Sequence, residues 1–93
     1  MQIRRTRAYQ VKLISILTYI AEDKTSASKK FLLALDQQIN NLPSFPYKYK
    51  QSIYFEDKNI RDMTYKKYTI NYHVNLNNDS IDILNIFNKN KPI

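Results

Sequence analysis

The sequence predicts an α+β fold of two layers, in which an N-terminal helical hairpin packs on a twisted, mainly antiparallel sheet in the order β-α-α-β-β-β. Residues 8–23 and 26–42 have apolar residues at helical spacing and are separated by a short break, which is typical of an antiparallel αα-hairpin. From residue 60 onward the apolar residues alternate as they do in strands. Neither layer has another place to bury its apolar side, so we expect the hairpin to cover one face of the sheet. With 93 residues, the chain has room for a single domain, residues 1–93.

The N-terminal half supplies a short strand and the two helices. Met1 to Tyr9 alternates weakly and carries repeated Arg, which favours an edge strand. The first helix, from Ala8 to about Asp23, is indicated by the apolar residues Tyr9, Leu13, Ile16, Leu17 and Ile20. Residues 22–26 break this pattern and offer N-cap candidates for a second helix from about Ser26 to Leu42, which Pro43 ends. The inner stripe of that helix consists of Ala27, Phe31, Leu35, Ile39 and Leu42, widened by Leu32.

The C-terminal half is predicted to be a loop followed by strands. The stretch PSFPYKYKQ, residues 43–51, is a loop because of its prolines, and residues 52–55 form a short strand. Residues 60–65 form a strand with Arg61, Met63 and Tyr65 on one face. The cleanest alternation runs from residue 68 to residue 76, with Tyr68, Ile70, Tyr72, Val74 and Leu76 inward and Thr69, Asn71, His73 and Asn75 outward.

The turns and the last strand complete the predicted meander. Asn77, Asn78 and Asp79 form a hairpin turn, and the apolar stretch from Ser80 to Phe87 is a central strand. The chain contains no Gly, so turn positions with positive φ must be occupied by Asn, Asp or Lys.

Composition bounds the partners and the compartment. Fifteen Lys and Arg against eight Asp and Glu give a net charge of +7, which favours polyanionic partners, either nucleic acid or an acidic protein; the plainer interpretation is a basic surface that keeps the protein soluble. The chain has no Cys, no apolar signal segment and no apolar run long enough to cross a bilayer, so we expect a cytoplasmic protein without a membrane partner. One His, no Cys and no glycine-rich loop predict no metal site and no small-molecule cofactor.

Two stretches carry a resemblance to a known family. YIAEDKTSASKKFLLALDQQINNLPSFPYKYK, residues 19–50, resembles the helix–helix–loop half of the RelE/ParE superfamily of toxins from type II toxin–antitoxin systems. IRDMTYKKYTINYHV and DSIDILNIF, residues 60–74 and 79–87, resemble the sheet of that superfamily, and the resemblance covers about Ile3 to Lys91. Members commonly have Gly in the turn that Lys66 and Lys67 occupy here, so we expect Lys67 to adopt a strained left-handed conformation.

The RelE-like members imply one function, a ribosome-dependent mRNA endoribonuclease that needs no metal. Such an enzyme needs a base, an acid and cations at the phosphate, and Lys48, Lys50 and Arg61 match the loop and strand from which RelE-like enzymes draw their cations. His73 is the candidate acid or base, because no His or Tyr follows it where members of the family commonly supply one. The plainer interpretations are a solvated His73, a solvated lysine pair, and an Arg61 that pairs with Asp62, Glu56 or Asp82.

The ParE-like members imply the function that we favour, inhibition of DNA gyrase, which requires only a basic, partly aromatic binding surface. The residues assigned to this surface are Tyr47, Lys48, Tyr49, Lys50, Arg61, Lys66, Lys67, Lys89 and Lys91. Membership in either branch implies a cognate acidic antitoxin, while the ribosome and mRNA replace gyrase as partners in the RelE-like alternative. A further alternative is a non-toxic basic module that binds nucleic acid non-specifically.

Overall fold

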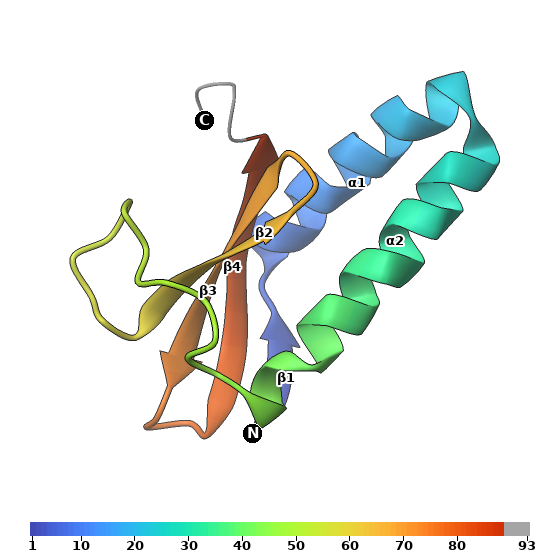
Figure 1. The fold of residues 1–93 in the computed structure, drawn as a ribbon. Helices are drawn as coiled ribbons and strands as arrows, with labels where there is room; N and C mark the ends of the chain where they lie inside the picture. Colours follow the sequence, from blue (N-terminus) through green and yellow to red (C-terminus); the bar gives the residue numbers. More distant parts are fainter. Residues whose placement is uncertain (89–93) are drawn as a thin grey trace.

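The computed structural model describes residues 1–88 and confirms the predicted α+β architecture (Figure 1). Strand β1 (Gln2–Arg5) leads into helices α1 (Arg7–Asp23) and α2 (Thr25–Asn40), and a short 3-10 turn, η1 (Leu42–Ser44), follows. Strands β2 (Ile60–Tyr65), β3 (Tyr68–Asn75) and β4 (Ser80–Asn88) form the meander. The sheet order is β1-β4-β3-β2, with β1 parallel to β4 and the other neighbours antiparallel, so β1 is the edge strand that the sequence predicts.

The helical hairpin covers one face of the sheet, and the core lies between them (Figure 1). The helices contribute Tyr9, Leu13, Phe31, Leu35 and Ile39, and the sheet contributes Met63, Ile70, Tyr72, Val74, Ile81, Ile83 and Ile86. Phe31 also meets the rings of Tyr65 and Tyr68 edge-on, with centroids 5.2 and 5.4 Å away, so α2 packs directly on the β2–β3 hairpin. Both predicted helical stripes are confirmed. No helix within residues 1–88 combines the length and the apolar character needed to cross a membrane.

The two helices are joined more tightly than the sequence predicts. Helix α2 begins at Thr25 rather than Ser26, and its N-cap is Lys24, an extended residue whose side chain makes no capping hydrogen bond. Thr25 therefore lies inside the first turn instead of before it. The hairpin is held instead by the buried Ser28, whose hydroxyl donates to the carbonyl of Leu17 over 2.8 Å. At the other end α2 stops at Asn40, and Pro43 lies in η1.

The face of the sheet away from the helices is less open than the alternation predicts. Thr69 and Asn71, expected to face outward into solvent, are only 5% and 2% exposed. They are covered because the segment after η1 folds back over them: the amide of Ile53 donates to Asp62 over 3.2 Å, and Asn71 donates to the other oxygen of that carboxylate over 2.7 Å. Residues 52–55 do not form the predicted strand, because the ladder pairing of this segment with β2 is limited to an isolated bridge at Gln51.

Two turns differ from their predictions by one residue. Lys66, not Lys67, has the positive φ of 54°, because the two-residue turn requires it at its first position. Leu76, expected at the inward end of β3, lies in the next turn and is 66% exposed. That turn begins early because the Asn75 side chain accepts a hydrogen bond from the amide of Asn78 over 3.1 Å. Asp79, with φ 50°, confirms that an acidic or amide residue takes the left-handed position.

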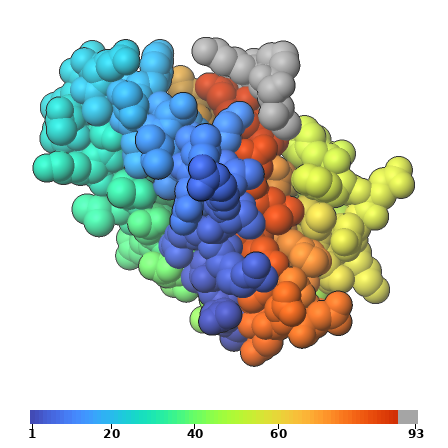
Figure 2. Space-filling model, turned by 180° about the vertical axis from the view of Figure 1, so that it is seen from behind, coloured from blue at the N-terminus to red at the C-terminus, as the bar shows by residue number. Residues whose placement is uncertain are grey.

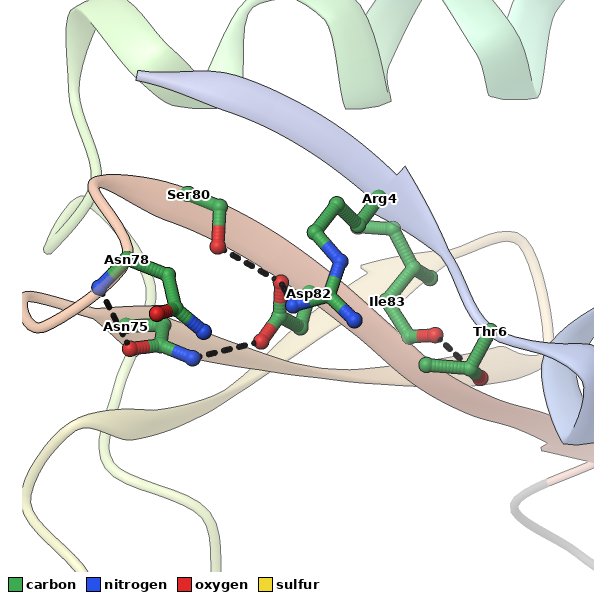
Figure 3. Close-up of polar contacts among 7 residues, drawn as sticks. All are labelled: Arg4, Thr6, Asn75, Asn78, Ser80, Asp82 and Ile83. Carbon is green, nitrogen blue, oxygen red and sulfur yellow. Dashed lines mark hydrogen bonds and ion pairs between the residues drawn. The ribbon is translucent and has the colours of Figure 1, made fainter.

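A polar cluster fixes the β3–β4 turn and the edge strand (Figure 3). The Asp82 carboxylate accepts hydrogen bonds from Ser80 over 2.8 Å and Asn75 over 2.9 Å, and Arg4 of β1 lies 3.6 Å away. Burial works to raise the pKa of Asp82, but the hydrogen bonds from Asn75 and Ser80 and the charges of Arg4 and His73 outweigh it, so that its pKa is lowered. This cluster is therefore stabilising while Asp82 is ionised.

Candidate functional site

The loop between η1 and β2, residues 45–59 and hereafter the connecting loop, presents four of the predicted binding residues, Tyr47, Lys48, Tyr49 and Lys50. It stands out from the sheet beside β4 when the molecule is seen from behind (Figure 2). Its first part is fastened by the Tyr72 hydroxyl, which donates to the carbonyl of Pro46 over 2.6 Å. Its two ends are joined by the Tyr47 hydroxyl, which donates to Asn59 over 2.8 Å. Burial raises the pKa of Tyr72 to about 12, so its hydroxyl keeps the proton that it donates.

Arg61 lies under the connecting loop and binds both of its arms. Its Nε donates to the carbonyl of Lys58 over 3.0 Å, and its Nη1 donates to the carbonyl of Tyr49 over 3.1 Å. The guanidinium also lies 4.9 Å from the centre of the Tyr47 ring, within the range of a cation–π contact. Within residues 1–88 Arg61 makes no ion pair, so the alternative of a surface pair with Asp62, Glu56 or Asp82 is wrong. Two of its five N–H donors are thus committed to the protein's own backbone.

Lys48 and Lys50 are exposed on the connecting loop, as a binding role requires. Neither forms an ion pair with a carboxylate among the described residues. The Lys48 ammonium lies 5.5 Å from the centre of the Tyr49 ring, whose hydroxyl reaches Gln38 of α2 at 3.4 Å. The structure therefore places Tyr47, Lys48, Tyr49 and Lys50 on one loop that is fastened by hydrogen bonds to Asn59, Gln38 and Tyr72.

Lys66 and Lys67 belong to a different part of the surface. They form the β2–β3 turn and line a hollow of about 660 Å³ between that turn and the tip of the helical hairpin, where Glu22 and Asp23 lie. Lys66 is also placed 5.7 Å from the centre of the Tyr65 ring. The predicted basic residues thus form two groups rather than one patch. Lys89 and Lys91, which complete the predicted set, lie outside the described residues.

The proposed catalytic pair is not assembled by the sheet. Arg61 lies opposite Tyr72 across the β2–β3 pair, so its side chain is on the face of the sheet that meets the helices. His73 lies opposite Ile60, and its side chain is on the other face of the sheet. His73 also faces Asp82 across β3 and β4, but no hydrogen bond or ion pair joins them within residues 1–88. A histidine–carboxylate dyad is therefore not formed. The described residues also contain no group of three His, Cys, Asp or Glu side chains placed to hold a metal ion.

Sequence reasoning missed the exposed apolar side chains of the connecting loop. Phe45, Ile53, Tyr54 and Phe55 are all exposed, although Ile53, Tyr54 and Phe55 were assigned to a strand that does not form. The sequence does contain a pattern that indicates exposed apolar residues here. The segment lies between two prolines and Asp57, and its apolar residues match neither a helical nor a strand period.

Comparison with known proteins defines first the fold class and then the family. The structure matches a chain of the chromosomal ParDE TA system from P. aeruginosa with a TM-score of 0.74 and 19% sequence identity, over 95% of each chain. At this identity the likeness establishes the fold alone. The sequence establishes the family, because residues 3–91 match the model of the ParE toxin of type II toxin-antitoxin system, parDE. The chain belongs to the ParE toxin family of type II toxin–antitoxin systems. Comparison with curated protein sequences finds no match.

Proposed function

We propose that this toxin arrests bacterial growth by binding DNA gyrase in the cytoplasm, and that a cognate acidic antitoxin neutralises it. The observation that carries the proposal is the arrangement of Arg61 and His73 on opposite faces of the sheet, with Arg61 committed to the carbonyls of Lys58 and Tyr49. Binding a protein target requires a stable, exposed surface. It does not require an arginine and a histidine that act together on one phosphate. The connecting loop, held by Arg61, Tyr47 and Tyr72, meets that requirement.

RNA cleavage by attack of a 2′-hydroxyl makes stricter demands on geometry. A base and an acid must reach the two sides of one phosphate within hydrogen-bond distance, and cations must surround the same phosphate. His73 is the only described histidine, and its ring lies on the face away from Arg61. The described residues therefore favour binding over cleavage. The RelE-like endoribonuclease, with the ribosome and mRNA as partners, is the outcome that the experiment below must exclude.

The charge of the toxin supports an acidic antitoxin. Within residues 1–88, the ion pairs are Arg4–Asp82 and Arg5–Asp36, which leaves Lys48, Lys50, Lys66 and Lys67 free of carboxylate partners. With a net charge of +7, the toxin attracts an acidic chain at long range and speeds their encounter. Because salt screens these charges, we expect the affinity of the toxin for its antitoxin to fall as the salt concentration rises.

The experiment that tests the proposal uses inducible expression in bacteria, with and without the protein encoded by the adjoining gene. We expect growth arrest and an SOS response without that protein, normal growth with it, and ribosome-bound messages that stay uncut. Lys48→Ala/Lys50→Ala should weaken the arrest, whereas the matched pair Lys29→Ala/Lys30→Ala, exposed on α2, should not. Normal growth at confirmed soluble expression would contradict toxicity, and codon-dependent cuts in ribosome-bound mRNA would replace gyrase with the ribosome.

A further inference from the structure

Exposed apolar side chains are concentrated on the connecting loop. Among residues 1–88, eleven large apolar side chains are exposed, and five of them fall between residues 45 and 55. These five are Phe45, Tyr47, Ile53, Tyr54 and Phe55, hereafter the crest. Phe45 is 67% exposed and Ile53 84%. Single exposed apolar residues are ordinary on a protein surface, whereas five on one short loop point to a binding site.

The crest borders two adjoining hollows. One, of about 640 Å³, is lined by Ser44, Phe45, Pro46, Tyr47 and Lys48. The other, of about 650 Å³, lies between the loop and the outer face of β2 and β3, with Lys48, Lys50, Ile53 and Tyr54 among its lining residues. Lys48 lines both hollows, so they are neighbours along the loop. Each has room for a large apolar side chain.

The crest is preformed, because several contacts from the sheet fix the loop beneath it. Backbone hydrogen bonds join Ser52 to Ile60 over 2.7 Å and Asp62 to Lys50 over 3.1 Å. The Tyr54 ring meets the Phe87 ring of β4 edge-on with centroids 5.1 Å apart. A partner that binds the crest therefore does not have to order the loop, which removes a common cost of binding.

The charges around the hollows select the kind of partner. Lys48 and Lys50 have no carboxylate partner within residues 1–88, and the one carboxylate that lines the hollows, Asp62, already accepts hydrogen bonds from Ile53 and Asn71. Two free cations beside apolar hollows complement a segment that carries both carboxylates and apolar side chains. Nucleic acid would use the cations and stack on the tyrosines, but every nucleotide also carries a charged phosphate, whereas a protein segment can place uncharged aliphatic side chains against Ile53.

We infer that the crest is a docking surface for an acidic protein segment, which places two apolar side chains in the adjoining hollows and carboxylates beside Lys48 and Lys50. The inference deepens the proposed function, since it gives the chemistry of the protein partner at the connecting loop. The apolar side chains supply the affinity, and the lysines fix the register and speed the encounter.

The test selects binders to the folded full-length toxin from a phage-displayed random peptide library. We expect the recovered peptides to be rich in Asp and Glu, with apolar residues between them. The affinity of a recovered peptide, measured by calorimetry, should fall by about tenfold or more for Phe45→Ser/Ile53→Ser, since each change removes an apolar contact. Lys48→Glu/Lys50→Glu should weaken it at least as much, and the loss should shrink at high salt.

Matched controls separate docking from folding. Leu33→Ser removes a side chain that is equally exposed, at 69%, but lies on α2, and Lys29→Glu/Lys30→Glu reverses two exposed α2 cations. These variants should keep the peptide affinity, and thermal melting should show every variant folded. The inference is overturned if no acidic peptide is recovered, or if the recovered peptides bind the crest variants and the control variants equally. It is also overturned if Phe45 and Ile53 are needed only for the binding of oligothymidylate or of anionic lipid vesicles.

The two proposals can fail separately. Peptide binding is measured on the purified toxin and does not depend on growth arrest. Crest-dependent binding by a protein that does not arrest growth would contradict the proposed function and leave the docking surface in place. Growth arrest and gyrase inhibition that persist unchanged in Phe45→Ser/Ile53→Ser, with no crest-dependent peptide, would contradict the docking surface alone.

Discussion

Replacement of Arg61 by Ala should release the connecting loop while leaving the rest of the sheet folded. The change removes two hydrogen bonds, of 3.0 and 3.1 Å, to the carbonyls of Lys58 and Tyr49, and the stacking on Tyr47. Each such hydrogen bond contributes about 0.5–1.5 kcal/mol net, and an exposed cation–π contact about 0.5–1 kcal/mol. Because one of the hydrogen bonds is exposed to solvent, we take about 2 kcal/mol for the three contacts together.

Amide hydrogen exchange measures this release residue by residue. The amides of Ser52 and Asp62 donate to partners across the loop–strand junction, so their protection depends on the loop staying attached. A loss of about 2 kcal/mol should speed their exchange roughly 30-fold in Arg61→Ala. The amide of Ile70, a buried residue in the middle of β3, should be affected much less.

The control for this experiment is Arg7→Ala, which removes an equal charge from the exposed start of α1. It should leave the exchange of Ser52 and Asp62 unchanged. The reasoning is refuted if Arg61→Ala exchanges like the wild type at both amides. If that result came with lost toxicity, Arg61 would act by direct contact with the target instead of by holding the loop.

Three further predictions concern particular side chains. Lys66→Gly should raise the free energy of unfolding by about 0.5–1 kcal/mol, because Gly adopts the positive φ of 54° without strain. Lys67→Gly should lower the free energy of unfolding, because Lys67 has no positive φ to relieve. Chemical denaturation that showed a change of the same sign for both variants would contradict the turn assignment. The Tyr9 hydroxyl is buried without a hydrogen-bond partner within residues 1–88, so Tyr9→Phe should leave the stability unchanged or raise it. Tyr72→Phe should lower the stability by about 1–3 kcal/mol, because it leaves the Pro46 carbonyl without its donor. Equal losses of stability for the two variants in thermal melts would contradict this prediction. Because the pKa of Asp82 is lowered in the folded state, its ionised carboxylate stabilises the fold above the unfolded pKa of 3.8, and this stability is lost as the pH falls through the folded pKa. Asp82→Asn should therefore flatten the dependence of the free energy of unfolding on pH below about pH 4. An unchanged slope would show that other groups cause the dependence.

The sequence was sufficient for the helices and the sheet because their patterns are local. The helical stripe of Phe31, Leu35 and Ile39 and the inward residues of β3 up to Val74 repeat at the periods of the elements that contain them. The predictions failed where a distant segment decides the environment. Asn71 is buried because residues far along the chain fold over it, and alternation within a strand contains no such information.

The candidate site was predictable in composition but not in arrangement. The YKYK stretch indicated a basic, aromatic loop, and the structure places these four residues together. The contacts of Arg61 were not predictable, because its partners are backbone carbonyls, one of them twelve residues away, and every residue type offers a carbonyl. By contrast, the placement of Arg61 and His73 on opposite faces follows from alternation within β2 and β3, because Arg61 shares the face of Met63 and His73 lies on the outward face of β3.

A supercoiling assay with purified toxin, DNA gyrase and relaxed plasmid tests the central claim most directly. The account predicts that the toxin inhibits supercoiling and accumulates linear, gyrase-cleaved plasmid, that the cognate antitoxin reverses both effects, and that Lys48→Ala/Lys50→Ala reduces them. Full supercoiling at a large excess of folded toxin would contradict the claim that gyrase is the target.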